Sequence, residues 1–261
     1  MECSQNTLLP VEVLLLIARL LEPWDLINLA IAIPGIERQY KPKYWIPIRD
    51  GEGNTVLHIC AIHKLDNFIV SLTEKKFDLH LTNGFGYTAL HSACEKGHAS
   101  SARLLLDARI DPNIPAIGGT TALHLAVSHG DLSMIRLLID RGADISAQTS
   151  GGYSILHWAV YSQICDVAAL IVSHGVDIDQ RDDFGRTPLH WAAWHDDAAT
   201  LGILLKAGAD AMCRDYDGYT PVDLAAQQGF KEVVSRMKGP GALNYVGFLG
   251  SIGYHLSRVM G

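Results

Sequence analysis

The hexapeptide Thr187-Pro-Leu-His-Trp-Ala192 decides the fold, because related versions of it recur along the chain. The other copies start at Thr55, Thr88, Thr121, Ser154 and Thr220, so that successive copies start 33 residues apart. A second signal keeps this register, since Gly-x-Asp occurs at residues 142–144, 175–177 and 208–210. Self-similarity at a fixed period of about 20–50 residues is typical of stacked repeat architectures. The sequence therefore predicts a solenoid of six 33-residue units.

Each unit carries the signals of two consecutive helices. The Ser or Thr that opens each hexapeptide offers a hydroxyl to helix N–H groups that have no partner within the helix. Pro188 and Pro221 stand at the next position, the first of the helix, where proline is tolerated. The second half of each unit is richer in bulky aliphatic residues, and neither helix can bury its apolar side alone. We therefore expect an all-α fold in which neighbouring units stack.

The 33-residue period and the Thr-Pro-Leu-His-x-Ala pattern resemble the ankyrin repeat over residues 50–238. The resemblance implies that loop tips and first helices line a concave groove. It also implies a structural role for the recurring histidine, which bonds backbone groups between loops and adjacent units. Those histidines are His58, His91, His124, His157 and His190, and Asp223 replaces them in the last unit, where no following unit needs to be held.

A metal site is the alternative explanation for the recurring histidines. Packed helices lie about 8–10 Å apart, whereas zinc–nitrogen distances are about 2 Å, so equivalent histidines cannot share one ion. His190 and His195 are five residues apart and lack the spacing of a zinc-binding helix. The chain also lacks a G-x-S-x-G motif, a phosphate-binding loop and a dinucleotide-binding motif. We predict no metal, no cofactor and no catalytic residue.

Two units depart from the pattern after their second helix. Lys76 and Arg109 stand where the later units have glycine, at the position that closes a helix in the left-handed conformation. A side chain there costs about 1–2 kcal/mol. We therefore expect the N-terminal end of the array to be its softer end.

Residues 1–49 carry a separate pattern. It runs from Leu9-Pro10 through an acidic residue at position 12 and an apolar helix to a Pro-x-Asp-Leu turn ending at Leu26. This segment resembles an F-box, which implies docking on a Skp-type adaptor protein. The adaptor-binding residues that the resemblance implies are Leu9, Pro10, Val13, Ile17, Leu21 and Leu26. Alternatively, the segment only caps the first repeat, because such arrays need their apolar ends covered.

Composition narrows the classes of partner. The net charge of −7 argues against a nucleic-acid backbone, which requires a basic face. The five scattered cysteines favour a reducing compartment over a disulfide framework. No apolar run approaches the ~18 residues of a membrane helix, and no basic region marks a signal peptide. Residues 239–261 form a glycine-rich apolar tail that can cap the last unit. We expect a cytoplasmic or nuclear protein.

The ankyrin resemblance places a partner groove on the loop tips and first helices. Aromatic residues are only 8% of the chain, yet they concentrate at these positions, and aromatics and arginine are the usual anchors of protein recognition. The groove residues carried over are Phe85, Tyr87, Tyr153, Tyr161, Phe184, Arg186, Trp194, His195, Tyr216 and Tyr219. Some of these side chains can instead pack between neighbouring loops. Trp158 and Trp191 occupy a more inward helix position, where we expect core packing.

Three functions follow from these patterns. The leading hypothesis is a substrate-recognition subunit of a Skp–cullin–F-box ubiquitin ligase, which holds a target protein in the groove and raises its effective concentration. The second is a free-standing ankyrin scaffold or inhibitor with a purely capping N-terminal segment. The third is an enzyme that binds a small molecule in the groove, with His195 as acid–base and Asp217 or Tyr161 beside it. The leading hypothesis expects no small-molecule ligand.

Overall fold

The computed structural model describes residues 49–238, which divide into two compact units. The first unit comprises the described residues through Ile117, and the second begins at Gly118. Residues 49–238 contain twelve helices and no strand, which confirms the predicted all-α fold for this part of the chain. None of these helices is long and apolar enough to cross a membrane. The F-box-like segment, with its adaptor-binding residues, and the glycine-rich tail lie outside the described residues.

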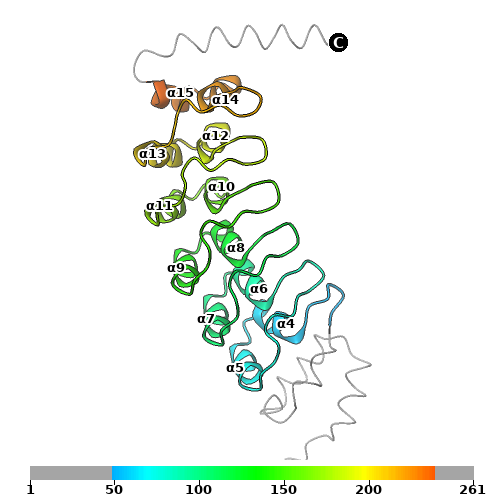
Figure 1. The fold of residues 1–261 in the computed structure, drawn as a ribbon. Coiled ribbons are helices and arrows are strands. Elements are labelled where there is room, and N and C mark those ends of the chain that lie inside the picture. The colour runs from blue at the N-terminus through cyan, green and yellow to red at the C-terminus, as the bar shows by residue number, and fades with distance from the viewer. Residues whose placement is uncertain (1–48, 239–261) are drawn as a thin grey trace, which may run out of the picture. The chain divides into compact units, whose positions relative to one another are not determined.

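The first unit contains two helix pairs. These are α4 (Val56–Ile62) with α5 (Asp66–Glu74), and α6 (Ala89–Glu95) with α7 (Ala99–Asp107). Within each pair the two helices pack against each other. The pairs also pack layer on layer, α4 on α6 and α5 on α7, as Figure 1 shows.

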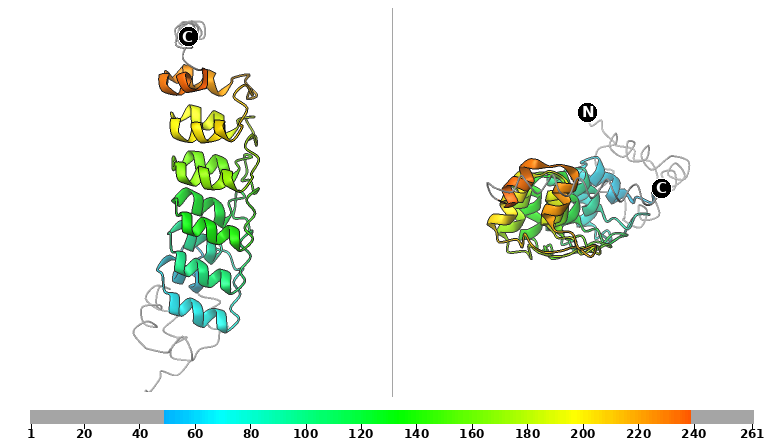
Figure 2. Two further views of the ribbon diagram at one scale, coloured as in Figure 1. Left: turned by 90° about the vertical axis from the view of Figure 1, so that its left-hand side faces the viewer. Right: turned by 90° about the horizontal axis from the view of Figure 1, so that it is seen from above.

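The second unit contains four helix pairs built in the same way. They are α8 (Ala122–His129) with α9 (Leu132–Asp140), α10 (Ile155–Tyr161) with α11 (Cys165–Ser173), α12 (Pro188–Trp194) with α13 (Ala198–Lys206), and α14 (Pro221–Gln228) with α15 (Lys231–Lys238). The first helices α8, α10, α12 and α14 pack in succession and lie beside the loops that precede them (Figure 1). Figure 2 shows these pairs as successive layers.

The start and the centre of each first helix follow from the hexapeptide. Thr187 has an extended backbone and Pro188 occupies the first helical turn, as the sequence predicts. The hydroxyl of Ser154 accepts a hydrogen bond from the backbone N–H of His157 at 3.4 Å. The hexapeptide closes with an alanine in five of the six copies, and each of these alanines is buried, so that helices can approach closely; they are Ala93, Ala126, Ala159, Ala192 and Ala225.

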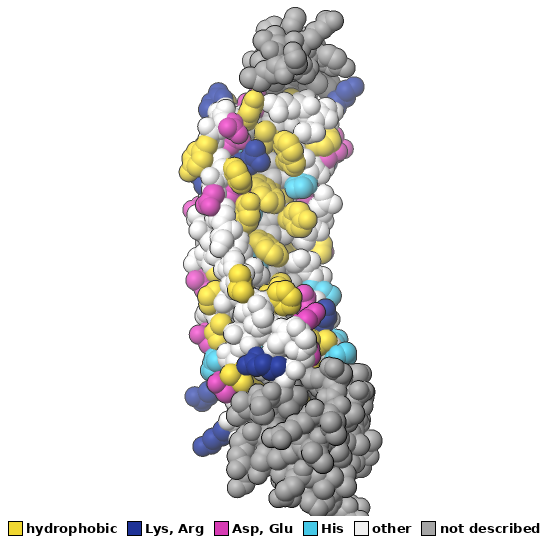
Figure 3. Space-filling view, turned by 90° about the vertical axis from the view of Figure 1, so that its right-hand side faces the viewer, with side chains coloured by type: hydrophobic (Ala, Val, Ile, Leu, Met, Phe, Trp, Pro, Cys, Tyr) yellow, Lys and Arg dark blue, Asp and Glu magenta, His cyan; other side chains and the backbone are white. Residues whose placement is uncertain are grey.

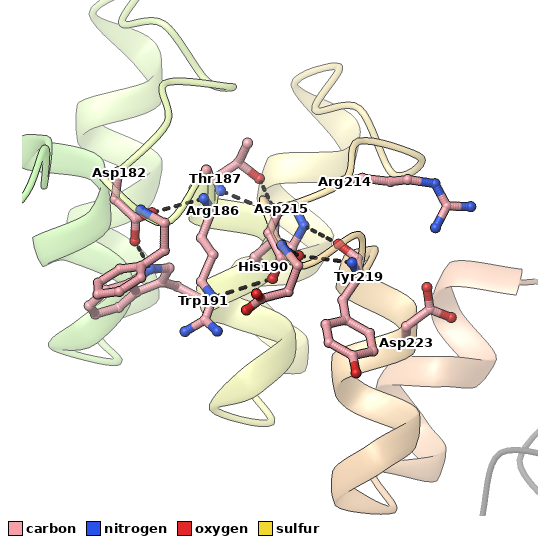
Figure 4. Close-up of polar contacts among 12 residues, drawn as sticks. Asp182, Arg186, Thr187, His190, Trp191, Arg214, Asp215, Tyr219 and Asp223 are labelled. Atoms are coloured by element: carbon pink, nitrogen blue, oxygen red, sulfur yellow. Dashed lines mark hydrogen bonds and ion pairs between the residues drawn. The ribbon is translucent and has the colours of Figure 1, made fainter. Parts of the chain in front are cut away.

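Buried histidines connect a helix pair to the loop of the next pair. The Nδ1 atom of His157 accepts a hydrogen bond from the backbone N–H of Ser154 at 3.2 Å, so the ring proton must lie on Nε2. Nε2 in turn donates to the backbone carbonyl of Arg186 at 3.0 Å. The same two bonds are made by His190 with Thr187 and Tyr219 (Figure 4), and by His58 with Thr55 and Tyr87. The predicted structural role of these three histidines is confirmed.

Burial keeps these histidines neutral. Desolvation is the largest cause that lowers the pKa of His58, His157 and His190 from the ordinary value of 6.5, and it outweighs the carbonyl bonds that raise the pKa. In the last pair, Asp223 accepts the backbone N–H of Thr220 at 3.0 Å and its hydroxyl at 2.7 Å. This carboxylate caps its own helix but has no second ring nitrogen with which to reach a following loop.

The lowered histidine pKa values predict a pH dependence of stability. A histidine whose pKa is lowered by folding stabilises the protein fully above the pKa of the unfolded chain, about 6.5, and this contribution is lost as the pH falls through the lower pKa of the folded state. We therefore expect the unfolding midpoint to be constant above about pH 7 and to fall between about pH 6.5 and pH 5, before most carboxylates protonate. Urea titrations across this range provide the measurement.

His190→Asn tests the origin of this pH dependence. The amide oxygen can still accept the Thr187 N–H, but the donor to the Tyr219 carbonyl is lost, which should cost about 1–3 kcal/mol. The variant should also lose less stability than the wild type on acidification. Asp223→Asn, at the same position of the last pair, is the control and should leave the pH profile unchanged. An unaltered profile in His190→Asn would show that other groups cause the acid sensitivity.

Five side-chain-bearing residues hold the left-handed conformation among the described residues. Lys76 and Arg109 have φ of +58° and +66°, as the sequence predicts, where later pairs have Gly142, Gly175 and Gly208. A second left-handed position, in the turn between paired helices, was not predicted from the sequence. Lys64, Gln163 and Asp196 occupy it with φ of +56°, and glycine occupies it elsewhere, as at Gly97 and Gly130.

Replacing Lys76 and Arg109 with glycine should stabilise the first unit. Removing left-handed strain gains about 1–2 kcal/mol per residue, against about 0.5–1 kcal/mol for the greater freedom of an unfolded glycine. We expect the free energy of unfolding to rise by about 1 kcal/mol in the double variant. The matched control is Gly175→Ala, which has open space around a new Cβ and φ of +75°, and should lose stability. A destabilised double variant would contradict the strain argument.

That the N-terminal pairs are the softer ones stays a prediction. Amide hydrogen exchange reports local opening, and we expect α4 to α7 to exchange before α12 to α15. The reverse order would contradict it.

Candidate functional site

A buried carboxylate shapes the loop in front of α12. Asp182 is only 3% exposed, and its Oδ1 accepts the backbone N–H groups of Phe184 at 2.9 Å and of Arg186 at 2.8 Å. Asp215 closes the next loop in the same way, through the N–H groups of Asp217 at 3.1 Å and Tyr219 at 2.8 Å. These bonds hold the loop tips that carry Phe184, Arg186 and Tyr219.

The second oxygen of Asp182 fixes a tryptophan. Its Oδ2 accepts a hydrogen bond from Nε1 of Trp191 at 3.0 Å (Figure 4). Trp191 directly follows the bridging His190 on α12 and is half-buried. The carboxylate thus ties the loop to the helix and sets the plane of the indole ring.

Other aromatic rings surround Trp191. Tyr153 and Tyr161 stand nearly perpendicular to it, with centroid distances of 5.2 and 6.3 Å and interplanar angles of 67° and 71°. The ring of His157 lies 5.8 Å from Trp191 at 79°. Such edge-to-face arrangements are the favourable geometry for aromatic pairs. Tyr153, His157 and Tyr161 come from α10 and its preceding loop, so the cluster joins two successive pairs of the second unit.

These rings line an open hollow of about 190 Å³. We call its lining the aromatic box: Tyr153, His157, Trp158, Tyr161 and Trp191. The lining is almost entirely apolar. Both ring nitrogens of His157 are engaged, by Ser154 and by the Arg186 carbonyl, and the Trp191 N–H is engaged by Asp182. The box therefore offers aromatic faces and few hydrogen-bonding groups.

A second, smaller hollow of about 120 Å³ adjoins the box and contains a cation. Its lining includes Arg186, Trp194 and His195. The guanidinium carbon of Arg186 lies 5.6 Å from the ring centroid of Phe184 and 5.7 Å from that of Trp194. Its Nε lies 3.4 Å from Oδ2 of the buried Asp215. Two rings and a carboxylate thus hold the guanidinium in place, which suits a preformed anchor.

The predicted groove residues occupy the surface in each unit. In the second unit we call them the aromatic face: Tyr153, Tyr161, Phe184, Arg186, Trp194, His195, Tyr216 and Tyr219. Tyr161, Phe184, Trp194, Tyr216 and Tyr219 are exposed, and the other three are half-buried. Figure 3 shows hydrophobic side chains gathered on the loop and first-helix side of the second unit. In the first unit Phe85 is exposed, and the half-buried Tyr87 stacks on His91 at 5.3 Å.

The prediction of core packing for Trp158 and Trp191 was wrong. Both are half-buried and line the aromatic box, because the gap between successive first helices is filled there by rings rather than by aliphatic side chains. The role of Asp182 was not predicted from the sequence either. A signal was present: Asp50, Asn83, Asp182 and Asp215 share one register of the 33-residue period, and each accepts two N–H groups of its own loop.

The geometry gives little support to acid–base chemistry at His195. Its ring lies 5.9 Å from that of Tyr161 at 80°, which is a packing contact. In the part of the chain that the structure covers, no carboxylate hydrogen-bonds to this imidazole. Asp217 is exposed on a loop tip. Among residues 49–238 no three His, Cys, Asp or Glu side chains are grouped so as to hold a metal ion.

Comparison with known families agrees with this architecture. The family model for ankyrin repeats, in three copies, matches residues 40–116, 109–182 and 156–242. No F-box model matches the N-terminal segment, and no curated protein matches the chain. The matched segments cover well over half of the 261 residues and include all twelve described helices. The chain belongs to the ankyrin-repeat family.

Proposed function

We propose that the aromatic face is the surface with which this ankyrin-repeat protein holds a partner protein. Ankyrin repeats indicate a protein-binding scaffold, and the family is typically a non-enzymatic interaction module. The observation that carries the proposal is the exposure of five large aromatic side chains on one side of the second unit. Clustered exposed aromatics normally mark an interaction site.

The aromatic face is also rigid, which favours binding. Asp182 and Asp215 close the loops that carry Phe184, Arg186 and Tyr219 through backbone hydrogen bonds. Tyr and Trp present a large area with few rotatable bonds, so little conformational entropy is lost on binding. A preformed surface of this kind binds a partner without reordering its own backbone.

A triple alanine variant tests the aromatic face. Replacing Tyr161, Trp194 and Tyr219 should reduce partner capture at least ~10-fold, since anchor residues typically contribute about 2 kcal/mol or more each. The matched control replaces Val70, Ile117 and Met212, which are exposed apolar residues outside the face. Quantitative affinity capture from cells of origin, with melting curves for both variants, provides the comparison. Equal capture by both triple variants would end this proposal.

We further propose that the N-terminal segment recruits a Skp-type adaptor, which would make the protein a substrate-recognition subunit of a ubiquitin ligase in the cytoplasm or nucleus. The F-box-like pattern of residues 9–26 supports this proposal. The unbroken register of hexapeptides from Thr55 to Thr220 supports a single array of six units behind that segment. Capping of the first repeat is the competing role.

Direct binding to a purified Skp-type adaptor separates these two roles. The full chain should bind, and Leu9→Ala with Pro10→Ala should weaken binding at least ~10-fold by removing buried anchor contacts. The groove triple variant should bind the adaptor as the wild type does, which makes it the control. If adaptor binding is absent while the double variant lowers the unfolding midpoint, the segment is a cap.

A further inference from the structure

The aromatic box selects for a particular kind of side chain. Trp191 forms one wall, and the rings of Tyr153, His157 and Tyr161 stand around it at 67°, 79° and 71°. An occupant therefore meets aromatic faces and edges on several sides. Tyr161 is 61% exposed, so the box opens to the surface beside it.

The lining offers few hydrogen bonds to an occupant, because it is almost entirely apolar. The two nitrogens of His157 and the indole N–H of Trp191 are already bonded within the protein. A primary ammonium or a carboxylate would exchange hydrogen bonds with water for contact with an almost entirely apolar lining, which is costly. An occupant without N–H or O–H groups avoids this cost.

The charges favour a cation among the occupants that remain. The described part of the second unit carries fifteen Asp and Glu against nine Lys and Arg, a net charge of −6. The buried Asp182 carboxylate accepts the Trp191 N–H and so increases the electron density of the indole. His157 is uncharged because burial lowers its pKa, and the charge of Arg186 in the adjoining hollow is offset by Asp215.

We propose that the aromatic box binds the trimethylammonium head of a trimethylated lysine in the partner protein. A quaternary ammonium is a permanent cation without N–H donors, and it is attracted to the faces of Trp and Tyr rings. The inference rests on the proposed protein-binding function and specifies which side chain of the partner the aromatic box binds.

Three peptides of one sequence test the proposal: one with a central trimethyllysine, one with unmodified lysine, and one with the neutral carbon isostere of trimethyllysine. Titrations against the full chain are followed by the indole N–H resonance of Trp191, assigned with Trp191→Phe. We expect the trimethyllysine peptide to bind about 5- to 30-fold more tightly than the isostere, as a cation–π energy of about 1–2 kcal/mol implies. Equal binding of the isostere would overturn the proposal.

A pair of tyrosine variants provides the matched control. Tyr161→Ala removes an exposed wall of the box and should weaken trimethyllysine binding at least ~10-fold, whereas Tyr161→Phe should retain binding. Met212→Ala, at a residue 72% exposed and outside both the box and the aromatic face, should have no effect. An equal loss in both alanine variants, or no loss in Tyr161→Ala, would contradict the assignment.

Free choline distinguishes a small-molecule site from a protein-recognition site. We expect choline to bind more weakly than the trimethyllysine peptide, because the peptide backbone adds contacts with the aromatic face. Choline binding as tight as the peptide would overturn the assignment to a partner lysine. Should no trimethylammonium probe bind while partner capture still depends on Trp194 and Tyr219, this inference fails and the proposed function stands.

Discussion

The rest of the structure depends on two hydrogen bonds made by the neutral, buried histidine at the third position of the first helix. A helix start leaves backbone N–H groups without partners, and a loop that turns into the next helix leaves carbonyls without partners. One imidazole satisfies both, because Nδ1 accepts from the cap residue and Nε2 donates 29 residues further along the chain. Aspartate at the same position, as in Asp223, can satisfy only the first group.

In the second unit this bridge ties the loops before α12 and α14 to the preceding helix pair through the carbonyls of Arg186 and Tyr219. The bridging nitrogen of His190 holds the carbonyl of Tyr219, while the Tyr219 ring is exposed on the aromatic face. The carbonyl of Tyr219 thus connects successive helix pairs, while its side chain is exposed at the surface. A rigid scaffold that carries variable loop residues is a common way to build binding sites.

Two neighbouring hollows offer different chemistry to a partner. The aromatic box is uncharged and almost entirely apolar, whereas the adjoining hollow is lined by Arg186, whose guanidinium lies over the rings of Phe184 and Trp194. Trp191 lines both hollows, so its single bond to Asp182 orients a wall that they share. A partner that fills both hollows would need an apolar group for the aromatic box and a group compatible with the Arg186 guanidinium beside it.

The fold of the described residues was predictable from the sequence because it follows from local chemistry repeated every 33 residues. The start of each first helix is specified by Thr or Ser, with histidine three residues later and, in two copies, proline in between. The end of the second helix is marked by the glycine of Gly-x-Asp in the later units. The exposure of Tyr161, Phe184, Trp194, Tyr216 and Tyr219 followed from the same register. Trp158 and Trp191 did not, because periodicity gives the direction of a Cα–Cβ bond but not what fills the space beyond it.

By itself, the sequence determined the helix pairs, their register and the residues on the loop tips. Only the tertiary structure decided that Tyr153 and Trp191, 38 positions apart, meet edge to face with their ring centroids 5.2 Å apart, and that Asp182 closes its loop and orients an indole. The physical reason is that such a cluster depends on the stacking of two successive pairs and on the rotamers that close packing permits. Neither is contained in the pattern of a single repeat.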